Sequence, residues 1–420
     1  MEKVAIVGYN RIPFARYNTA YIDYTNQDLL VAALNGLIDK YKLHGQRMGE
    51  VAAGAVVKHS NESNLVREAV LKTALSPDTP GTDIQKACTT GIEAVITIAN
   101  KIARGQIEAG IAGGVDSISN LPIGISEKHR KILLKASRAK SFTEKIKIFA
   151  SLRPKDLKPV PYRGQEPETG LTMGEHTELT AAWYGITRQQ QDELALRSHQ
   201  NLAKAYDEGF YHDLVTPFGG LSQDNTLRRD TSLEKLSKLK PAFPKTGQLL
   251  TAGNSTNFTD GASSVLLASE EWAAKHHLPV LAYVTYAETG AIEYIKDRHN
   301  LLLAPVATAA RMLQKANLTL QDFDFYEIHE AFAAQVLATL KIWEDEELSK
   351  QFGLPHALGK IDLQKLNVKG SSLATGHPFA ATGGKVVATL AKLLNTKGSG
   401  RGLISVCAAR GQGATMILEK

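Results

Sequence analysis

Strand-like apolar runs alternate with helix-like segments along the chain. The runs Val4–Val7 and Glu50–Val57 predict strands, whereas apolar residues at helical spacing predict helices near Asn26–Asp39 and Ser63–Ala74. This alternation is typical of proteins that pack helices against the faces of a sheet. The sequence therefore predicts an α/β fold.

Two stretches far apart in the chain share one layout. Each has a turn of small residues, then a helix, then a strand that runs into a glycine-rich turn. The first comprises Asp83–Gly91, a helix to Ala103 and a strand at Ala109–Val115, and the second comprises Val368–Pro378, a helix to Leu394 and a strand at Gly402–Ala408. Such an internal repeat predicts two similar α/β halves.

The stretch between the halves differs from them in composition. Residues 121–250 are polar, basic and interrupted by prolines, with a helical pattern around Thr187–Tyr206. We predict an N-terminal half from 1–120 plus 251–273, an inserted loop domain from 121–250, and a C-terminal half from 274–420.

Composition narrows the class of protein. The chain has 420 residues, 43% hydrophobic and 22% charged, which excludes disordered and fibrous proteins and allows a large core without metal or disulfide links. Two cysteines, Cys88 and Cys407, are too few for a disulfide scaffold or a cysteine zinc site. No apolar run approaches the ~20 residues of a membrane span, and the strand-like run at Val4 follows no signal peptide. We therefore expect a cytoplasmic protein.

Most of the positive charge lies in one segment. The net charge is +6, yet Lys128–Lys158 holds eleven Lys and Arg against two acidic residues. Apolar residues recur there at roughly helical spacing, and a basic amphipathic helix can lie on an anionic membrane surface or meet an acidic ligand such as a nucleotide phosphate. A solvated helical face packed on the body explains the pattern equally well. Nucleic acid is not an expected partner, because the segment has almost no interleaved aromatic residues.

Cys88 and His377 are candidates for nucleophilic chemistry. Cys88 precedes a helical pattern, and a helix N-terminus lowers the pKa of a thiol, which favours the thiolate. His377 lies between Gly376 and Pro378, in a rigid loop that fixes the direction of its imidazole. Each residue also fits a structural role, as a buried small side chain or a satisfied core histidine. The glycines and Lys385 that follow resemble a phosphate-binding loop but lack its spacing.

Two further segments carry candidate chemistry. Cys407 ends a strand and enters a tight turn through Ala409, where exposed backbone N–H groups can form an oxyanion hole. His329 and Glu330 lie at a strand-to-helix junction, where capping is an ordinary role. This pair lacks the following histidine of a zinc motif, so no metal site is expected.

Together these segments resemble the thiolases, over nearly the whole chain. The matching segments are, in order, Arg11–Phe14, Cys88–Gly91, Gly113–Ser117, Met173-Gly174, Ala252–Thr256 with Asp260–Ala262, His329–Ala333, Gly376–Pro378 and Cys407. Within the family, His329 (most members have Asn) and the Gly376–Gly383 block look most like the β subunits of trifunctional fatty-acid oxidation complexes.

The resemblance implies a fold and a reaction. The fold has two βαβαβαββ halves in five αβαβα layers, with an inserted loop domain. The reaction is the cleavage of 3-oxoacyl-CoA by CoA to acetyl-CoA and a shortened acyl-CoA, in fatty-acid β-oxidation, through an acyl-enzyme on a cysteine. CoA is a substrate, and no permanently bound cofactor is implied. A homodimer or tetramer is implied as well, and an α subunit with hydratase and dehydrogenase activity is left open as a partner.

The resemblance also assigns roles to single residues. Cys88 would be the nucleophile, His377 the base, and Cys407 the acid that protonates the departing acetyl-CoA carbanion. One oxyanion hole would pair His377 with a water held by His329, and the other would use the N–H groups of Cys88 and Ala409. The CoA pantetheine would pass Met173, Thr256 and Phe332.

Two questions stay open at this stage. An acetoacetyl-CoA thiolase working in the condensing direction is an alternative, as is a scaffold or membrane-docking subunit with secondary activity; a decarboxylating ketosynthase fits less well, because it uses Cys-His-His. Arg410 also replaces a glycine that usually follows the second cysteine. If that position has a positive φ, arginine costs about 1 kcal/mol or more there, and its guanidinium could meet a CoA phosphate or a neighbouring subunit.

Overall fold

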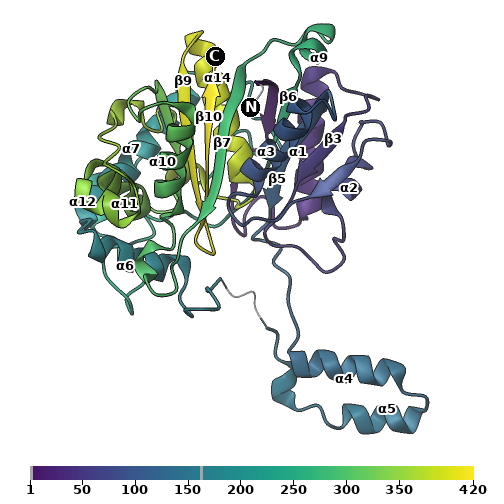
Figure 1. The fold of residues 1–420 in the computed structure, drawn as a ribbon. Coiled ribbons are helices and arrows are strands. Elements are labelled where there is room, and N and C mark those ends of the chain that lie inside the picture. Colours follow the sequence, from purple (N-terminus) through teal and green to yellow (C-terminus); the bar gives the residue numbers. More distant parts are fainter. Residues whose placement is uncertain (1–2, 161–163) are drawn as a thin grey trace. The chain divides into compact units, whose positions relative to one another are not determined.

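The computed structural model describes residues 3–160 and 164–420. By the contacts between residues, the chain forms two units (Figure 1). The first unit comprises Met1–Val56, Ser63–Asn120 and Gln165–Lys420, and the second comprises Val57–Glu62 and Leu121–Gly164.

The first unit contains one mixed sheet. Its strands are β1 (Val4–Arg11), β2 (Ala15–Arg16), β3 (Glu50–Ala53), β4 (Gly81–Asp83), β5 (Ala109–Asp116), β6 (Thr259–Ala268), β7 (Ala282–Ala291), β8 (Phe325–Ile328), β9 (Arg401–Ala408) and β10 (Gln412–Glu419). They follow the order β4-β3-β5-β6-β1-β7-β10-β9-β8, and β2 pairs with β6 beside this path.

The strand order contains the internal repeat. Inside the edge strand β4, the N-terminal half runs β3-β5-β6-β1 toward the centre of the sheet, and the C-terminal half runs β8-β9-β10-β7 from the other edge. In each half the first pair is parallel and the next two are antiparallel. The halves join where Val4–Ile6 of β1 pairs with Ala282–Val284 of β7. The prediction of two similar α/β halves is confirmed.

The first unit also contains helices, some packed on the sheet and others on those helices. They are α1 (Asn26–Tyr41), α2 (Leu65–Val70), α3 (Thr90–Ala103), α6 (Met173–Trp183), α7 (Arg188–Asp207), α8 (Leu233–Ser237), α9 (Glu270–Lys275), α10 (Ala304–Ala316), α11 (Ala333–Glu344), α12 (Glu346–Gln351), α13 (Ser372–Thr375) and α14 (Ala381–Lys397), with short 3-10 turns at Arg298–Asn300 and Leu363–Lys365.

Three hydrophobic cores define the layers. The central core joins Val95 of α3 and Leu390 of α14 to Leu267 of β6 and Met416 of β10, so these two helices lie between the two halves of the sheet. The second core packs α1 and α2 on the far face of the N-terminal strands, and the third packs α10 and α11 on the far face of the C-terminal strands. In Figure 1, α10, α11 and α12 lie on the left of the first unit and α2 on the right. This is the predicted five-layer arrangement, and with both faces covered every residue of β6 is buried.

Most elements predicted from the sequence occur near their expected bounds. The helix expected at Asn26–Asp39 is α1, and the one expected around Thr187–Tyr206 is α7. The strand expected at Glu50–Val57 ends at Ala53, because the N–H of Val56 turns to the Asp116 carboxylate instead of a neighbouring strand. The predicted domain boundaries follow the repeat rather than the contacts, and they stay a prediction.

The two halves of the fold approach each other closely where the start of α14 meets α3 and β5. A Cβ added at Gly114 of β5 would lie 2.1 Å from the carbonyl oxygen of Ala380, and one added at Gly91 of α3 would lie 2.6 Å from it. Any larger residue would therefore push the start of α14 away from α3 and β5. The loop that leads into α14 contains His377, so this contact positions the site described below.

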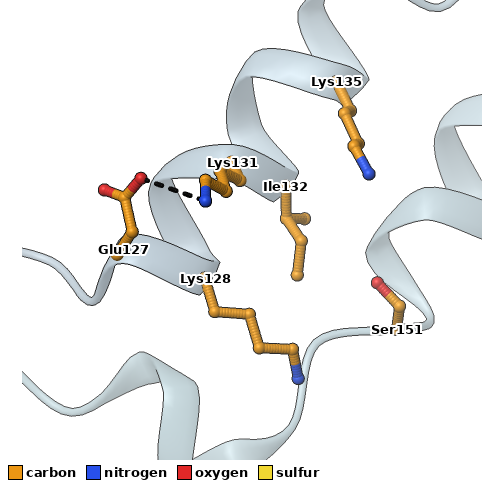
Figure 2. A pocket seen from close by; sticks show the side chains of 6 residues that line it. All are labelled: Glu127, Lys128, Lys131, Ile132, Lys135 and Ser151. Carbon is orange, nitrogen blue, oxygen red and sulfur yellow. Dashed lines mark ion pairs between the residues drawn. The ribbon is translucent and has the colours of Figure 1, made fainter.

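The second unit is a helical hairpin. It contains α4 (Glu127–Arg138), α5 (Phe142–Phe149) and a 3-10 turn at Pro154–Leu157. Between the helices lies an open hollow of about 490 Å³, lined by Glu127, Lys128, Lys131, Ile132, Lys135 and Ser151 (Figure 2). Helix α5 buries none of its side chains. No helix in the described ranges is long and apolar enough to cross a bilayer.

A buried ion pair ties strand β1 to the segment before α8. Arg11 Nη1 and Nη2 lie 2.6 and 2.8 Å from the two carboxylate oxygens of Asp224, and neither side chain is exposed. Asp224 also accepts hydrogen bonds from the Phe14 N–H and the Tyr206 hydroxyl. The Arg11 guanidinium, the Phe14 N–H and the Tyr206 hydroxyl thus all depend on one carboxylate.

Replacing this carboxylate should destabilise the fold. Asp224→Ala should lower the free energy of unfolding by about 3–5 kcal/mol, because it leaves the Arg11 guanidinium buried without its counter-ion. Asp207→Ala is the matched control: Asp207 pairs with Arg229 at the surface, and its loss should cost less than about 1 kcal/mol. Urea unfolding of both variants measures the difference, and equal midpoints would contradict the prediction.

Candidate active site

Cys88 lies in the loop between β4 and α3, just before the helix begins. Ala87 has a φ of 48°, a left-handed conformation that costs a non-glycine residue energy and is typical of functional turns. The residue is partly buried, and its sulfur lies 3.1 Å from Nε2 of His377. Two residues that are 289 positions apart are therefore at hydrogen-bond distance.

His377 is positioned by a second hydrogen bond on the other side of its ring. Nδ1 lies 2.5 Å from Oγ1 of Thr382, in the first turn of α14. Nε2 accepts a proton from the thiol only if Nδ1 carries the ring hydrogen, and the Thr382 oxygen can accept that hydrogen. Sequence reasoning gave Thr382 no role, because a hydroxyl five residues after a histidine is not distinctive until the two side chains are seen in contact.

Burial keeps both partners neutral. It raises the pKa of the Cys88 thiol to about 12, against the opposing effect of the backbone N–H groups of Ala409 and Cys88 itself. It lowers the pKa of His377 to about 3, and the positive charge of Lys385 acts in the same direction. The expectation that the helix N-terminus lowers the Cys88 pKa is wrong, because the loss of water around a thiolate outweighs those N–H groups. The free site holds a thiol beside a neutral imidazole.

Cys407 lies at the end of β9, next to Cys88. It is buried in a cluster with Tyr294, Leu301 and Ala331. Burial raises the pKa of the Cys407 thiol well above its usual range, and the charge that Cys88 can carry raises it further. Such coupling weakens with distance, so it places Cys407 in the same region of the fold as Cys88. Two residues later, Ala409 directs its N–H to the Cys88 sulfur.

His329 lies beside His377, between β8 and α11. The two ring centroids are 4.1 Å apart. Nδ1 of His329 lies 2.8 Å from Oγ of Ser372, whereas Nε2 has no hydrogen-bond partner in the described part of the chain. Buried polar atoms rarely lack a partner, so Nε2 is available to a water or a substrate group. Burial lowers the pKa of His329 well below its usual value, which keeps the ring neutral.

The residues expected along the CoA path surround Cys407. Met173 begins α6 and Phe332 precedes α11, and both pack against the Cys407 cluster. Thr256 donates hydrogen bonds to the Ala331 carbonyl from its N–H at 3.1 Å and its hydroxyl at 3.0 Å. The structure therefore brings the predicted site residues into one region of the first unit. Within residues 3–160 and 164–420, no group of three or more His, Cys, Asp or Glu is arranged to hold a metal ion.

Comparison with known families agrees with this geometry. The thiolase N-terminal domain matches residues 4–271, and the thiolase C-terminal domain matches residues 279–420. The chain belongs to the thiolase family.

Individual thiolases match along the full chain. A 3-ketoacyl-CoA thiolase of Erwinia tasmaniensis is 39% identical over 428 residues, and one of Serratia proteamaculans is 40% identical over 425; each alignment covers 100% of this chain and 97% of the relative. Among solved structures, human mitochondrial 3-ketoacyl-CoA thiolase superimposes with a TM-score of 0.81 at 26% identity, covering 100% of this chain and 99% of that one. Bacillus anthracis acetyl-CoA acetyltransferase gives 0.82 at 29%, with the same coverage.

Arg410, where thiolases usually have glycine, is accommodated within the chain. Its φ is 65°, so the position does have the left-handed backbone that glycine adopts without strain. Its guanidinium lies 2.9 Å from Oε2 of Glu166, and its N–H donates to Oε1 of the same carboxylate at 3.2 Å. Tyr294 donates to Glu166 at 2.7 Å. The guanidinium is thus engaged by the buried Glu166 of the same chain.

The raised thiol pKa predicts how Cys88 reacts in the free thiolase. In a Cys407→Ser variant, where Cys88 is the remaining cysteine, alkylation by iodoacetamide should accelerate about tenfold per pH unit between pH 7 and 9, because the reactive thiolate fraction grows with pH below the pKa. Peptide mass spectrometry against time measures the rate. A rate that levels off below pH 8 would show a lowered pKa and contradict the prediction.

Proposed function

We propose that this thiolase cleaves 3-oxoacyl-CoA with CoA, giving acetyl-CoA and an acyl-CoA shortened by two carbons. The observation that carries the proposal is the meeting of Cys88, His377 and Cys407 in one site. The relatives named 3-ketoacyl-CoA thiolase, aligned over the whole chain, support the same reaction. CoA acts as a substrate; one of the solved human structures is a complex with CoA.

The first half of the reaction forms an acyl-enzyme. The Cys88 sulfur bonds to the keto carbon of the substrate while its proton passes to Nε2 of His377, 3.1 Å away. This transfer generates the thiolate only at the moment of attack, which suits a pair that burial keeps neutral. The bond between C2 and C3 then breaks, its electron pair stays on C2 of the departing acetyl-CoA, and Cys407 protonates that carbon.

The second half returns the enzyme to its starting state. The proton on His377 restores the Cys407 thiol, and the CoA thiol then attacks the Cys88 thioester as its own proton passes to His377. That proton returns to the Cys88 sulfur when the acyl group leaves as acyl-CoA. Oxyanions form in both halves of the reaction. The N–H groups of Cys88 and Ala409 are suited to stabilise one of them, and His377 with a water held by His329 is suited to stabilise the other.

The condensing direction is the alternative within the family. An acetoacetyl-CoA thiolase would use the same residues in reverse, and Bacillus anthracis acetyl-CoA acetyltransferase is among the similar structures. The full-length relatives favour the degradative reaction. Turnover of acetoacetyl-CoA compared with 3-oxopalmitoyl-CoA distinguishes the two. Assembly as a homodimer or tetramer, an α subunit as partner, and a cytoplasmic location stay predictions.

Because the two cysteines have different proposed roles, replacing each of them should impair different steps of the reaction. With a saturated acyl-CoA as donor, acyl transfer to Cys88 breaks no carbon–carbon bond and needs no acid at Cys407. Cys407→Ser should therefore still gain the acyl mass, whereas Cys88→Ser should not, and both should lose at least about a thousandfold in thiolysis of 3-oxoacyl-CoA. Intact-protein mass spectrometry and a thiolysis assay measure the two effects. Acylation of Cys88→Ser at the normal rate would contradict the mechanism.

A second proposal concerns the hairpin. We propose that α5 lies on an anionic membrane surface. Phe142, Ile146 and Phe149 recur at helical spacing and are 77, 53 and 44% exposed, so they form an apolar stripe on a short helix rich in lysine. Such a helix can insert its apolar face among lipid headgroups while its lysines meet anionic lipid.

Vesicle flotation tests this placement. The protein should float with phosphatidylglycerol vesicles and not with neutral ones, and the double change Lys145→Glu and Lys147→Glu should reduce binding about tenfold or more, given about 1 kcal/mol for each lysine near the surface. Lys275→Glu, an exposed lysine outside the hairpin, is the matched control and should bind as before. Unchanged binding by the double variant would overturn the proposal.

A further inference from the structure

Lys385 is a buried lysine for which the mechanism above has no role. It lies in α14, is 2% exposed, and shares its helix with Thr382. Its ammonium nitrogen lies 3.2 Å from Oγ1 of Thr375, 3.4 Å from Oγ of Ser372 and 3.5 Å from Oγ of Ser371. Three hydroxyl oxygens thus match the three N–H donors of an ammonium group.

Ser372 connects this ammonium group to the active site. Within the described chain its hydroxyl has two partners, Nζ of Lys385 at 3.4 Å and Nδ1 of His329 at 2.8 Å. Both Ser372 and His329 are fully buried, so water does not compete freely for these bonds. The order Lys385, Ser372, His329 is therefore a continuous chain of polar atoms that ends beside His377.

The direction of hydrogen bonding along this chain follows from the donors. A hydroxyl can accept two hydrogen bonds and donate one, whereas an ammonium group can only donate. Ser372 therefore accepts from Lys385, and within the described chain Nδ1 of His329 is the acceptor left for its own hydrogen. Nδ1 then bears no hydrogen, and the single hydrogen of the neutral ring is on Nε2. Nε2 is the atom that has no partner in the described chain.

We propose that Lys385, acting through Ser372, fixes His329 in the tautomer that carries its hydrogen on Nε2. The inference rests on the proposed function, since a donor at Nε2 is what an oxyanion, or the water that contacts it, requires. In the other tautomer, Nε2 would present a lone pair and repel the developing negative charge. Lys385 and Ser372 are thus positioning residues that act through His329.

Burial lowers the pKa of Lys385 to about 8, and two buried glutamates act in the opposite direction. They are Glu327 in β8 and Glu330, which directly follows His329, and both favour the charged form of Lys385. The Glu330 carboxylate is held by the Ser198 hydroxyl at 2.7 Å, the Asn367 amide at 2.7 Å and the Leu373 N–H at 3.2 Å. Burial raises the pKa of Glu330, and these three hydrogen bonds oppose that shift. When Glu330 is ionised, its charge favours the ammonium form of Lys385, on which the hydrogen bonds to Ser372 and His329 depend.

The tautomer can be observed directly. In protein labelled with ¹⁵N-histidine, the protonated and bare ring nitrogens resonate far apart, and loss of a signal in His329→Asn assigns it. We expect His329 to show hydrogen on Nε2 in the unaltered enzyme, and a mixture of tautomers in Lys385→Met. Hydrogen on Nδ1 in the unaltered enzyme would overturn the proposal, even if the Lys385→Met variant failed to fold.

A double-mutant cycle, measured by kcat, tests whether the His329 tautomer affects the reaction. The Asn amide always carries N–H donors and has no tautomer to fix, so Ser372→Ala should lower kcat about tenfold with His329 present and less than twofold in a His329→Asn background. Lys385→Arg, which keeps a donor-only cation, should retain most of kcat, whereas Lys385→Met should not. KM should change little in each case.

These outcomes distinguish the proposed effect of Lys385 and Ser372 on His329 from the proposed reaction. If Ser372→Ala had the same effect in both backgrounds, Ser372 would be a structural residue and the proposed action of Lys385 through Ser372 on His329 would be wrong. The Cys88 acyl-enzyme would still form in that case. Failure of the unaltered protein to form any acyl-enzyme would instead overturn the proposed function. The His329 tautomer would be measurable in either case.

Discussion

The close contact between the two halves of the fold is the constraint on which the site depends. The backbone at Ala380 approaches Gly114 and Gly91 so closely that a methyl group on either glycine would overlap it. This contact fixes the start of α14 against α3, and so fixes His377 against Cys88. A displacement of 1 Å there would separate the imidazole from the thiol, because a proton transfers only across a short hydrogen bond.

Burial then sets the electrostatics of the site. With little water near them, the Cys88 thiol and the His377 imidazole are both more stable uncharged, and charge appears only when the thiol adds to a carbonyl. Donors placed in advance are strongest in such surroundings, since no water has to reorganise around the oxyanion. Lys385 contacts the Ser372 hydroxyl that bonds to His329, so in the proposed arrangement it acts on the donor through Ser372.

The turn after Cys407 shows how this chain tolerates an arginine in place of glycine. The left-handed backbone at Arg410 is offset by its ion pair with Glu166 and by the bond from its N–H to the same carboxylate. Tyr294, which packs with Cys407, also binds Glu166. The strained residue is therefore part of a network that holds Ala409, and with it one oxyanion donor, against the rest of the site.

The sequence by itself determined the α/β class, the two-half repeat and the residues with the chemistry, because periodicity and motifs are local properties. The tertiary structure decided what depends on neighbours distant in the chain. The Cys88 pKa rises although its position before a helix predicted the opposite, because burial is a property of the whole fold. Thr382, Ser372 and Glu166 likewise become visible only as partners, since a hydroxyl or carboxylate has no distinctive pattern until its neighbour in space is known.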